Sequence, residues 1–181
     1  MMGGMERVIV AGISGAGKTT MATELAARFG LPRVELDALH HGPGWVKRPE
    51  FEAEVEQFTA GEAWVCEEQY QGALGDLLWR RADTLVWLDL PRRTVMWRVI
   101  KRSLSRVAFR RELWNGNRET WRGLLLDPEH PVRWAWARHG VKRKNTAERL
   151  AAHPHLEVVR LSSAGEAQRW LGTISGERTR E

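Results

Sequence analysis

Short apolar runs alternate along this chain with segments in which apolar residues recur every three or four positions. The runs are rich in β-branched residues and predict strands at 7–11, 34–36, 64–66, 84–89 and 156–161. The helical spacing predicts helices over 19–29, 50–59, 75–81, 92–106, 131–140, 146–152 and 164–171. Because strands and helices alternate, we expect an α/β fold in which a parallel sheet lies between helices.

The second predicted strand ends beside an acidic residue. It leads directly to Asp37, and a loop rich in glycine and proline follows over 41–45. Ligands of open parallel sheets bind at the carboxyl ends of the strands. Asp37 is therefore a candidate general base or acceptor anchor, with a helix N-cap or a loop acid as the alternative interpretation.

The first predicted strand runs into a glycine-rich segment, residues 12–19, which reads Gly-Ile-Ser-Gly-Ala-Gly-Lys-Thr. It fits the P-loop pattern G-x-x-x-x-G-K-[ST], in which backbone N–H groups and a helix N-terminus surround phosphate oxygens. Lys18 is expected to contact the β- and γ-phosphates, and the Thr19 hydroxyl to bind Mg²⁺. The segment predicts a site for ATP and Mg²⁺ formed by Gly12, Ser14, Gly15, Ala16, Gly17, Lys18, Thr19 and Thr20.

The positive charge of the chain is concentrated in its second half. The formal net charge is +5, and residues 92–149 hold sixteen Lys and Arg against five Asp and Glu. Such a block attracts polyanions, either the phosphates of a nucleotide or a nucleic acid, unless it is a solvated helix face. There is no helix-turn-helix signature or zinc motif in the sequence, so nucleic acid is the less favoured partner.

Composition excludes several classes of protein. No apolar run reaches the roughly 18 residues that a membrane span needs, and no signal peptide is recognisable. A single cysteine, Cys66, excludes an internal disulfide and is expected to be a buried, inert thiol. We expect one domain over residues 1–181, cytoplasmic, without membrane contact, and either monomeric or homodimeric.

Further motifs make the chain resemble a known group. They are Leu-Asp-Ala-Leu at 36–39, Gly-Pro-Gly-Trp at 42–45, Trp64-Val65 with Tyr70, Arg-Ala-Asp at 81–83, Leu-Asp-Leu-Pro at 88–91, and Trp97-Arg98 with Lys101-Arg102. With the P-loop, they make residues 7 to about 171 similar to the adenylate-kinase-like small P-loop kinases. More narrowly, the chain resembles the bacterial "DNA topology modulation protein" or "adenylate kinase-related" group. The resemblance implies the strand order 2-3-1-4-5 and an Arg-rich helical lid over about 103–130.

The resemblance also implies roles for single residues. Arg98 and Arg102 would lie near the ATP phosphates and adenine, and Arg110 would belong to the lid. Members of the group carry Trp-Val-x-Asp-Gly-Asn-Tyr on the third strand, whereas this chain has Glu67 and Glu68 in place of the Asp and Gly. Glu67 would then organise the metal together with Thr19. Glu68 would add bulk and charge beside the substrate.

Three functions are compatible with these features. The leading interpretation is an ATP-dependent phosphotransferase acting on a small acceptor, such as a nucleotide, a nucleoside or another hydroxyl compound. The second is a nucleic-acid-associated P-loop NTPase or nucleotide-binding regulator, suggested by the basic block. The third is a P-loop protein that binds nucleotide as a switch without turnover. The chain is too short for most motor ATPases and lacks the guanine-reading Asn-Lys-x-Asp motif.

Overall fold

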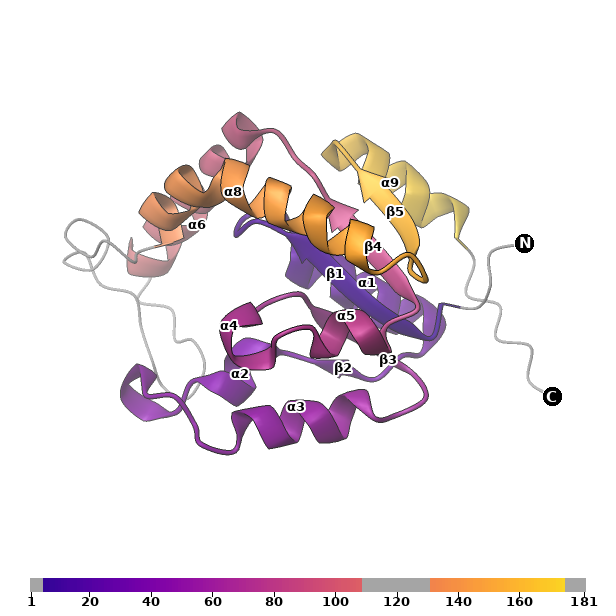
Figure 1. Ribbon diagram of the computed structural model, residues 1–181. Helices are drawn as coiled ribbons and strands as arrows, with labels where there is room; N and C mark the ends of the chain where they lie inside the picture. The colour runs from indigo at the N-terminus through magenta and orange to yellow at the C-terminus, as the bar shows by residue number, and fades with distance from the viewer. Residues whose placement is uncertain (1–4, 109–130, 175–181) are drawn as a thin grey trace.

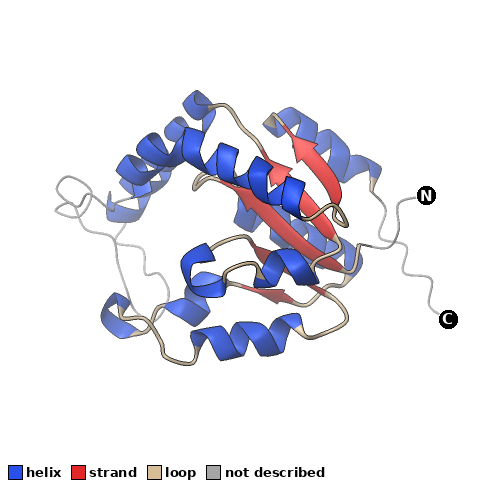
Figure 2. Ribbon diagram, in the orientation of Figure 1, coloured by secondary structure: helices blue, strands red, loops and turns tan. Residues whose placement is uncertain are grey.

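A five-stranded parallel sheet forms the centre of the protein (Figures 1 and 2). The computed structural model describes residues 5–108 and 131–174. The strands are β1 (Arg7–Gly12), β2 (Arg33–Val34), β3 (Trp64–Glu67), β4 (Thr84–Leu88) and β5 (Glu157–Leu161). Their order is β2-β3-β1-β4-β5, and every pairing is parallel. The predicted fold class and strand order are therefore confirmed.

Helices and short helical turns connect the strands and cover the sheet. They are α1 (Lys18–Phe29), α2 (Leu36–His40), the 3-10 turn η1 (Pro43–Trp45), α3 (Phe51–Thr59), α4 (Gln71–Leu74), α5 (Leu77–Arg81), α6 (Arg92–Ala108), α8 (Pro131–Ala152) and α9 (Ala164–Thr173). In Figure 1, α8 and α5 lie in front of the sheet and α1 lies behind it. Within the described part of the chain, no helix is long and apolar enough to cross a membrane.

Two hydrophobic clusters, one on each face of the sheet, form the core. In β1, Val8 and Val10 belong to one cluster, while Ile9 and Ala11 belong to the other. The first cluster also draws residues from α1, α6 and α9, and the second from α3 and α5. Because both faces of the central strand are covered, its sequence is a continuous apolar run rather than an alternating one. Burying one such side chain stabilises the fold by about 1.5–3 kcal/mol.

The parallel register brings the ends of three elements together at one edge of the sheet. Val10 of β1 pairs with Glu67, the last residue of β3, so Glu67 lies level with the start of the P-loop. Leu88, which ends β4, pairs with Gly12 at the end of β1. The predicted site residues of β1 and β3 therefore meet at the carboxyl edge, as expected for an open parallel sheet.

Two of the predicted element boundaries are wrong. The second strand stops at Val34, and Asp37 lies in the first turn of α2 instead of at a strand end. The predicted helices 131–140 and 146–152 are a single helix, α8, which continues through Gly140. Contacts along α8, from His139 to the Leu90 carbonyl and from Arg149 to the Gly75 carbonyl, tie this helix to the rest of the fold. These contacts override the weak helix propensity of glycine.

Gly15 is expected to be indispensable for stability. Its φ is 84°, and a Cβ at this position would lie 2.3 Å from Cγ2 of Val99 on α6. Gly15→Ala should therefore lower the free energy of unfolding by about 2–4 kcal/mol, from backbone strain and overpacking together. Urea denaturation measures this loss. The matched control is Gly72→Ala, because a Cβ at Gly72 meets nothing within 4 Å. Equal stability of the two variants would contradict the prediction.

Candidate active site

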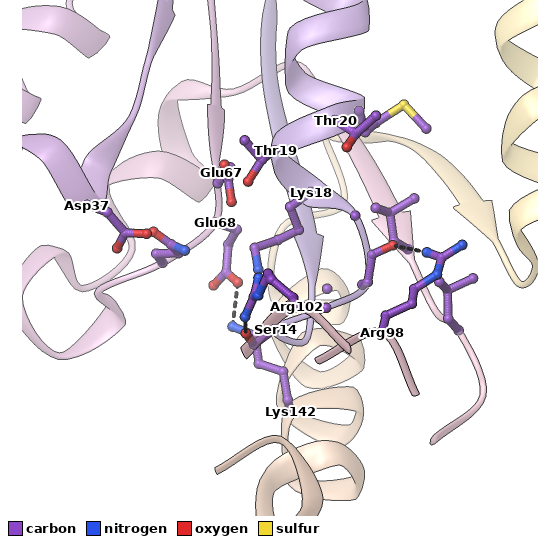
Figure 3. Close-up of a pocket in the computed structure, with 18 of the residues that line it drawn as sticks. Ser14, Lys18, Thr19, Thr20, Asp37, Glu67, Glu68, Arg98, Arg102 and Lys142 are labelled. Atoms are coloured by element: carbon purple, nitrogen blue, oxygen red, sulfur yellow. Dashed lines mark hydrogen bonds and ion pairs between the residues drawn. The ribbon is translucent and has the colours of Figure 1, made fainter. Parts of the chain in front are cut away.

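A cavity of about 1390 Å³ opens at the carboxyl edge of the sheet. The P-loop, the segment from β2 to η1, the end of β3, and helices α6, α8 and α9 all contribute to its walls. All of the predicted nucleotide-binding residues line it: Gly12, Ser14, Gly15, Ala16, Gly17, Lys18, Thr19 and Thr20. Figure 3 shows Asp37 on one side of Lys18 and Arg98 on the other, so the cavity has two ends that meet at the P-loop.

The P-loop backbone leaves the N-terminus of α1 open toward the cavity. Gly17, the N-cap residue, has φ 102°, and no side chain caps the helix. The Ala16 amide donates to the Ile13 carbonyl, which closes the loop into a turn. The free N–H groups at the start of α1, together with its partial positive charge, suit an anionic phosphate.

Lys18 projects from the first turn of α1 into a cluster of acids. It is only 8% exposed, and burial lowers the pKa of its ammonium group. The nearby carboxylates of Glu67, Glu68 and Asp37 oppose this shift, while Lys142 adds to it. A buried cation of this kind gains most from a phosphate, which supplies negative charge at close range where water is excluded.

Arg98 and Arg102, one turn apart on α6, both bond to the P-loop. Arg98 Nη1 donates to the Ala16 carbonyl at 3.2 Å, and Arg102 Nη2 donates to Ser14 Oγ at 2.9 Å (Figure 3). Both side chains line the cavity. Guanidinium groups in this position can form forked hydrogen bonds to phosphate oxygens.

Thr19 and Glu67 supply oxygen atoms beside Lys18. Both line the cavity, and Glu67 is buried, with its carboxylate 4.0 Å from Arg33. Among the residues described, no group of three or more His, Cys, Asp and Glu side chains could hold a metal ion. Two oxygen donors nevertheless fit Mg²⁺, which binds to one or two protein groups plus phosphates and keeps several waters.

Glu68 does not add a free charge to the substrate path, contrary to the expectation from sequence. It is 1% exposed, and its carboxylate forms an ion pair with Lys142 of α8 and accepts a hydrogen bond from Gln71. Trp79 Nε1 lies 3.4 Å from the same carboxylate. Burial raises the pKa of the Glu68 carboxyl, but the charge of Lys142 and these hydrogen bonds outweigh it and hold that pKa below its usual value.

Asp37 lies at the other end of the cavity, where it is hydrogen-bonded to one of a group of aromatic side chains. The Tyr70 hydroxyl donates to Asp37 Oδ1 at 2.5 Å and lies 3.0 Å from His41 Nε2. Burial, together with the charge of Asp37, raises the pKa of Tyr70, so its hydroxyl stays protonated as a donor. Trp45 lies beside His41 and also lines the cavity.

The sequence did not single out Arg138, Lys142 and Asn145, which line the cavity from α8. They recur at intervals of four and three residues, which puts them on one helix face. That spacing is a signal from which the sequence could have identified this face, but the sequence-based prediction ends a helix at Gly140 and therefore does not place the three residues on one helix. Arg110, the predicted lid arginine, lies outside the described residues, as does the lid segment 109–130.

Asp89, which follows β4, has a structural role as the partner of two arginines. Its carboxylate pairs with Arg143 at 3.0 Å and with Arg160 at 2.5 Å, and it does not line the cavity. It therefore joins α8 to β5, although its position at a strand end resembles that of a metal-binding acid.

Comparison with solved structures shows the fold alone. Shikimate kinase from Acinetobacter baumannii, solved with shikimate, aligns over 93% of this chain and 89% of its own, with TM-score 0.53 and 16% identity. Shikimate kinase from Bacteroides thetaiotaomicron (TM-score 0.49, 13% identity, 93% and 96% covered) and a gluconokinase from Sinorhizobium meliloti 1021 (0.46, 17%, 93% and 92%) also match. No family model and no curated protein sequence matches the chain. The chain has the fold of the small P-loop kinases.

Loss of Lys142 should destabilise the protein in a pH-dependent way. Lys142→Met leaves Glu68 buried without its ion-pair partner, which typically costs about 3–5 kcal/mol. The pKa of Glu68 is lower in the folded protein than its unfolded value of 4.5. The ion pair therefore stabilises the folded protein fully at pH values above 4.5, and this stabilisation is lost as the pH falls through the folded pKa. In the variant, burial instead raises the pKa of Glu68. The deficit should be largest near neutral pH and shrink in acid.

Urea denaturation at about pH 7 and about pH 4 measures this difference. The matched control is Lys144→Met on the same helix, because the Lys144 side chain is 74% exposed and its ion pair with Glu148, at 3.6 Å, is also exposed. We expect it to change stability by about 0.5 kcal/mol or less. A pH-independent deficit in Lys142→Met would show that the pair does not hold Glu68 ionised.

Proposed function

We propose that this protein is an ATP-dependent phosphotransferase that moves the γ-phosphate of ATP to a hydroxyl group of a small acceptor, with Mg²⁺ as cofactor. One observation carries the proposal: a complete P-loop and the Asp37–Tyr70 pair face the same cavity from its two ends. The fold of the small P-loop kinases supports it. The narrower resemblance to the bacterial DNA topology modulation group belongs to the same proposal and rests on the sequence motifs.

ATP would bind with its phosphates on the P-loop. The backbone N–H groups of residues 15–19 and the start of α1 would hold the β-phosphate, and Lys18 would reach the β- and γ-phosphates. Arg98 and Arg102 would add forked hydrogen bonds from α6. Lys142, which lines the same cavity from α8, would contribute a further positive charge to the transferred phosphoryl group. Arg110 is proposed to complete the set from the lid.

Thr19 and Glu67 would hold Mg²⁺ at the phosphates, the glutamate either directly or through water. The ion would neutralise charge on the β- and γ-phosphates during transfer. Arg33 helps to position Glu67, because it lies 4.0 Å from that carboxylate and also pairs with Glu35 at 2.8 Å.

Asp37 would act on the acceptor. Its carboxylate accepts the proton of the acceptor hydroxyl while that oxygen forms a bond to the γ-phosphorus. The bond between the γ-phosphorus and the bridging oxygen breaks, and ADP leaves with the electron pair. The Tyr70 hydroxyl, held by the same carboxylate, would orient Asp37 for this step.

Five cations of the basic block contact other groups within the protein. Arg98 and Arg102 bond to the P-loop, Lys142 pairs with Glu68, Arg143 with Asp89, and Arg149 with Asp76. These five cations are thus committed to contacts within the protein. These five residues do not form the exposed stripe of free cations that is typical of a nucleic-acid-binding protein.

The test is an ADP assay with ATP, Mg²⁺ and separate pools of nucleosides, sugars and other hydroxyl compounds. ADP formation that depends on an acceptor supports the proposal. ADP formation stimulated only by nucleic acid would replace it with the NTPase alternative. Tight ATP binding without ADP under any condition would leave a nucleotide-binding switch.

Lys18→Ala should abolish turnover without unfolding the protein. Removing a cation aimed at the transferred phosphate costs about 3–4 kcal/mol of transition-state stabilisation, or a roughly 10²- to 10³-fold loss of rate. Initial ADP rates measure the loss, and circular dichroism checks the fold. The exposed Lys144→Ala is the control and should keep full activity. Normal turnover in folded Lys18→Ala would refute the phosphotransferase function.

Asp37→Asn should lower the maximal rate far more than ATP affinity. The amide is nearly isosteric but cannot accept the acceptor proton, so kcat should fall by about 10²- to 10⁴-fold. The dissociation constant of ATP, measured by calorimetry, should stay within a few-fold of the wild-type value. A matching loss of ATP affinity would instead assign Asp37 to the metal site or to the structure.

A further inference from the structure

The end of the cavity around Asp37 has an aromatic wall formed by His41, Trp45 and Tyr70, with His40 and Phe51 packed behind Tyr70. The rings of His40 and Tyr70 stack with their centroids 4.0 Å apart at 17°. Phe51 packs edge-on against Tyr70 at 5.1 Å, and Trp45 packs edge-on against His41 at 5.2 Å. Because each ring contacts another, the wall has a defined shape before any acceptor binds.

Two residues of this wall have unusual backbones. Trp45 has φ 65° and Tyr70 has φ 53°, and they are the non-glycine residues with positive φ in the part of the chain that the structure describes. Such conformations are unfavourable for bulky residues and cluster at functional sites. Both residues lie in the same wall of one cavity, which indicates that this wall has a role in binding a ligand.

Trp45 is held at the rim of the cavity by a closed loop. The Gly42 amide donates to the Val46 carbonyl at 2.8 Å, and the Arg48 amide donates to the His40 carbonyl at 2.9 Å. The loop thus resembles a small hairpin with Trp45 near its tip, and Trp45 remains 42% exposed. Core packing does not explain why a large aromatic side chain is kept in this strained position. A ligand that stacks on the indole does.

The charges at this end are negative. From the segment 35–71, the described lining residues include four acids but no Lys or Arg. Glu68 pairs with Lys142, and Arg33 lies 2.8 Å from Glu35 and 4.0 Å from Glu67, whereas Asp37 accepts a hydrogen bond from the uncharged Tyr70 hydroxyl. The lining cations of the described chain come from α1, α6 and α8. Of these, Lys142 already pairs with Glu68, and Figure 3 shows it on the P-loop side of that carboxylate, away from Asp37.

We infer that the acceptor is an uncharged compound with a hydroxylated ring, whose face stacks on Trp45 while one hydroxyl donates to Asp37. The inference rests on the proposed function and narrows its substrate. A carboxylate has about four lone-pair sites, and Tyr70 uses one of them on Asp37. An acceptor hydroxyl can therefore bond to the same group. A ring with apolar faces, either a sugar or a nucleoside, gains contact with the exposed indole.

An anionic acceptor would be rejected by charge. A carboxylate or phosphate on the acceptor, placed about 4 Å from Asp37, meets a like charge near the protein surface. Repulsion of that size lowers affinity on the order of 100-fold or more. The site therefore discriminates between two versions of one ring that differ only in an added negative charge.

Matched pairs of acceptors test the inference. Glucuronate methyl ester is compared with glucuronate, uridine with orotidine, and methyl shikimate with shikimate, so that each pair keeps all its hydroxyl groups, by initial ADP rates at saturating ATP and Mg²⁺. We expect a neutral member of at least one pair to be phosphorylated, with kcat/KM at least 100-fold above that of its anionic partner. The pair that responds distinguishes a sugar from a nucleoside acceptor.

A tryptophan variant tests the aromatic platform. Trp45→Ala should raise the KM of the neutral acceptor at least tenfold with little change in kcat, because the indole contacts a part of the acceptor that does not react. The control is Trp97→Ala, since Trp97 is 68% exposed on α6 and does not line the cavity. It should leave both constants unchanged.

The outcomes separate this inference from the proposed function. Preference for an anionic member, or equal KM values for Trp45→Ala and Trp97→Ala, overturns the acceptor class while phosphotransfer still stands. If no member of any pair yields ADP from a protein that binds ATP, the proposed function itself is contradicted, and the inference falls with it.

Discussion

The contact between the P-loop and α6 leaves no room for a side chain at position 15. A Cβ there would lie 2.3 Å from Val99 Cγ2 and 3.1 Å from the Val95 carbonyl oxygen. This packing allows Arg98 and Arg102 to reach the loop from the same helix, where they bond to Ala16 and Ser14. Moving α6 outward by the width of a methyl group would change the loop's shape and withdraw both guanidinium groups. The P-loop and the packing of α6 are therefore one structural unit.

Charge balance in the cavity constrains the rest of the site. Three acids, Asp37, Glu67 and Glu68, surround Lys18, and Lys142 offsets the most deeply buried of them. A buried carboxylate without a partner would be costly, so α8 must stay where its Lys142 meets Glu68. The contacts of Arg143 with Asp89 and of Arg149 with Asp76 hold the same helix at other points. The position of α8 is thus fixed by ion pairs along its second half.

The sequence predicts the parts of this protein that depend on local pattern. The β1 run, the P-loop and α1 follow from apolar residues and glycines, and the resemblance to known kinases supplied the strand order. Asp37 was placed at the correct edge of the sheet, although in α2 rather than on a strand. The Glu68–Lys142 pair spans 74 positions, and neither residue carries a local signal for the other. Gly140 interrupted the helical pattern of α8, and only tertiary contacts make that helix continuous.

The two ends of the cavity are built in different ways, and this difference explains why the fold alone does not identify the proposed acceptor. The phosphate end uses backbone N–H groups, a helix N-terminus and a sheet edge, which any chain with this fold can present. The acceptor end uses side chains on the short elements α2, η1 and α4, whose loops can change without disturbing the sheet. Asp37 and Trp45 lie in α2 and η1, and Tyr70 is the N-cap residue of α4. The proposed acceptor must therefore be inferred from the chemistry of these side chains: a carboxylate, a phenol and an indole carried on a backbone with positive φ.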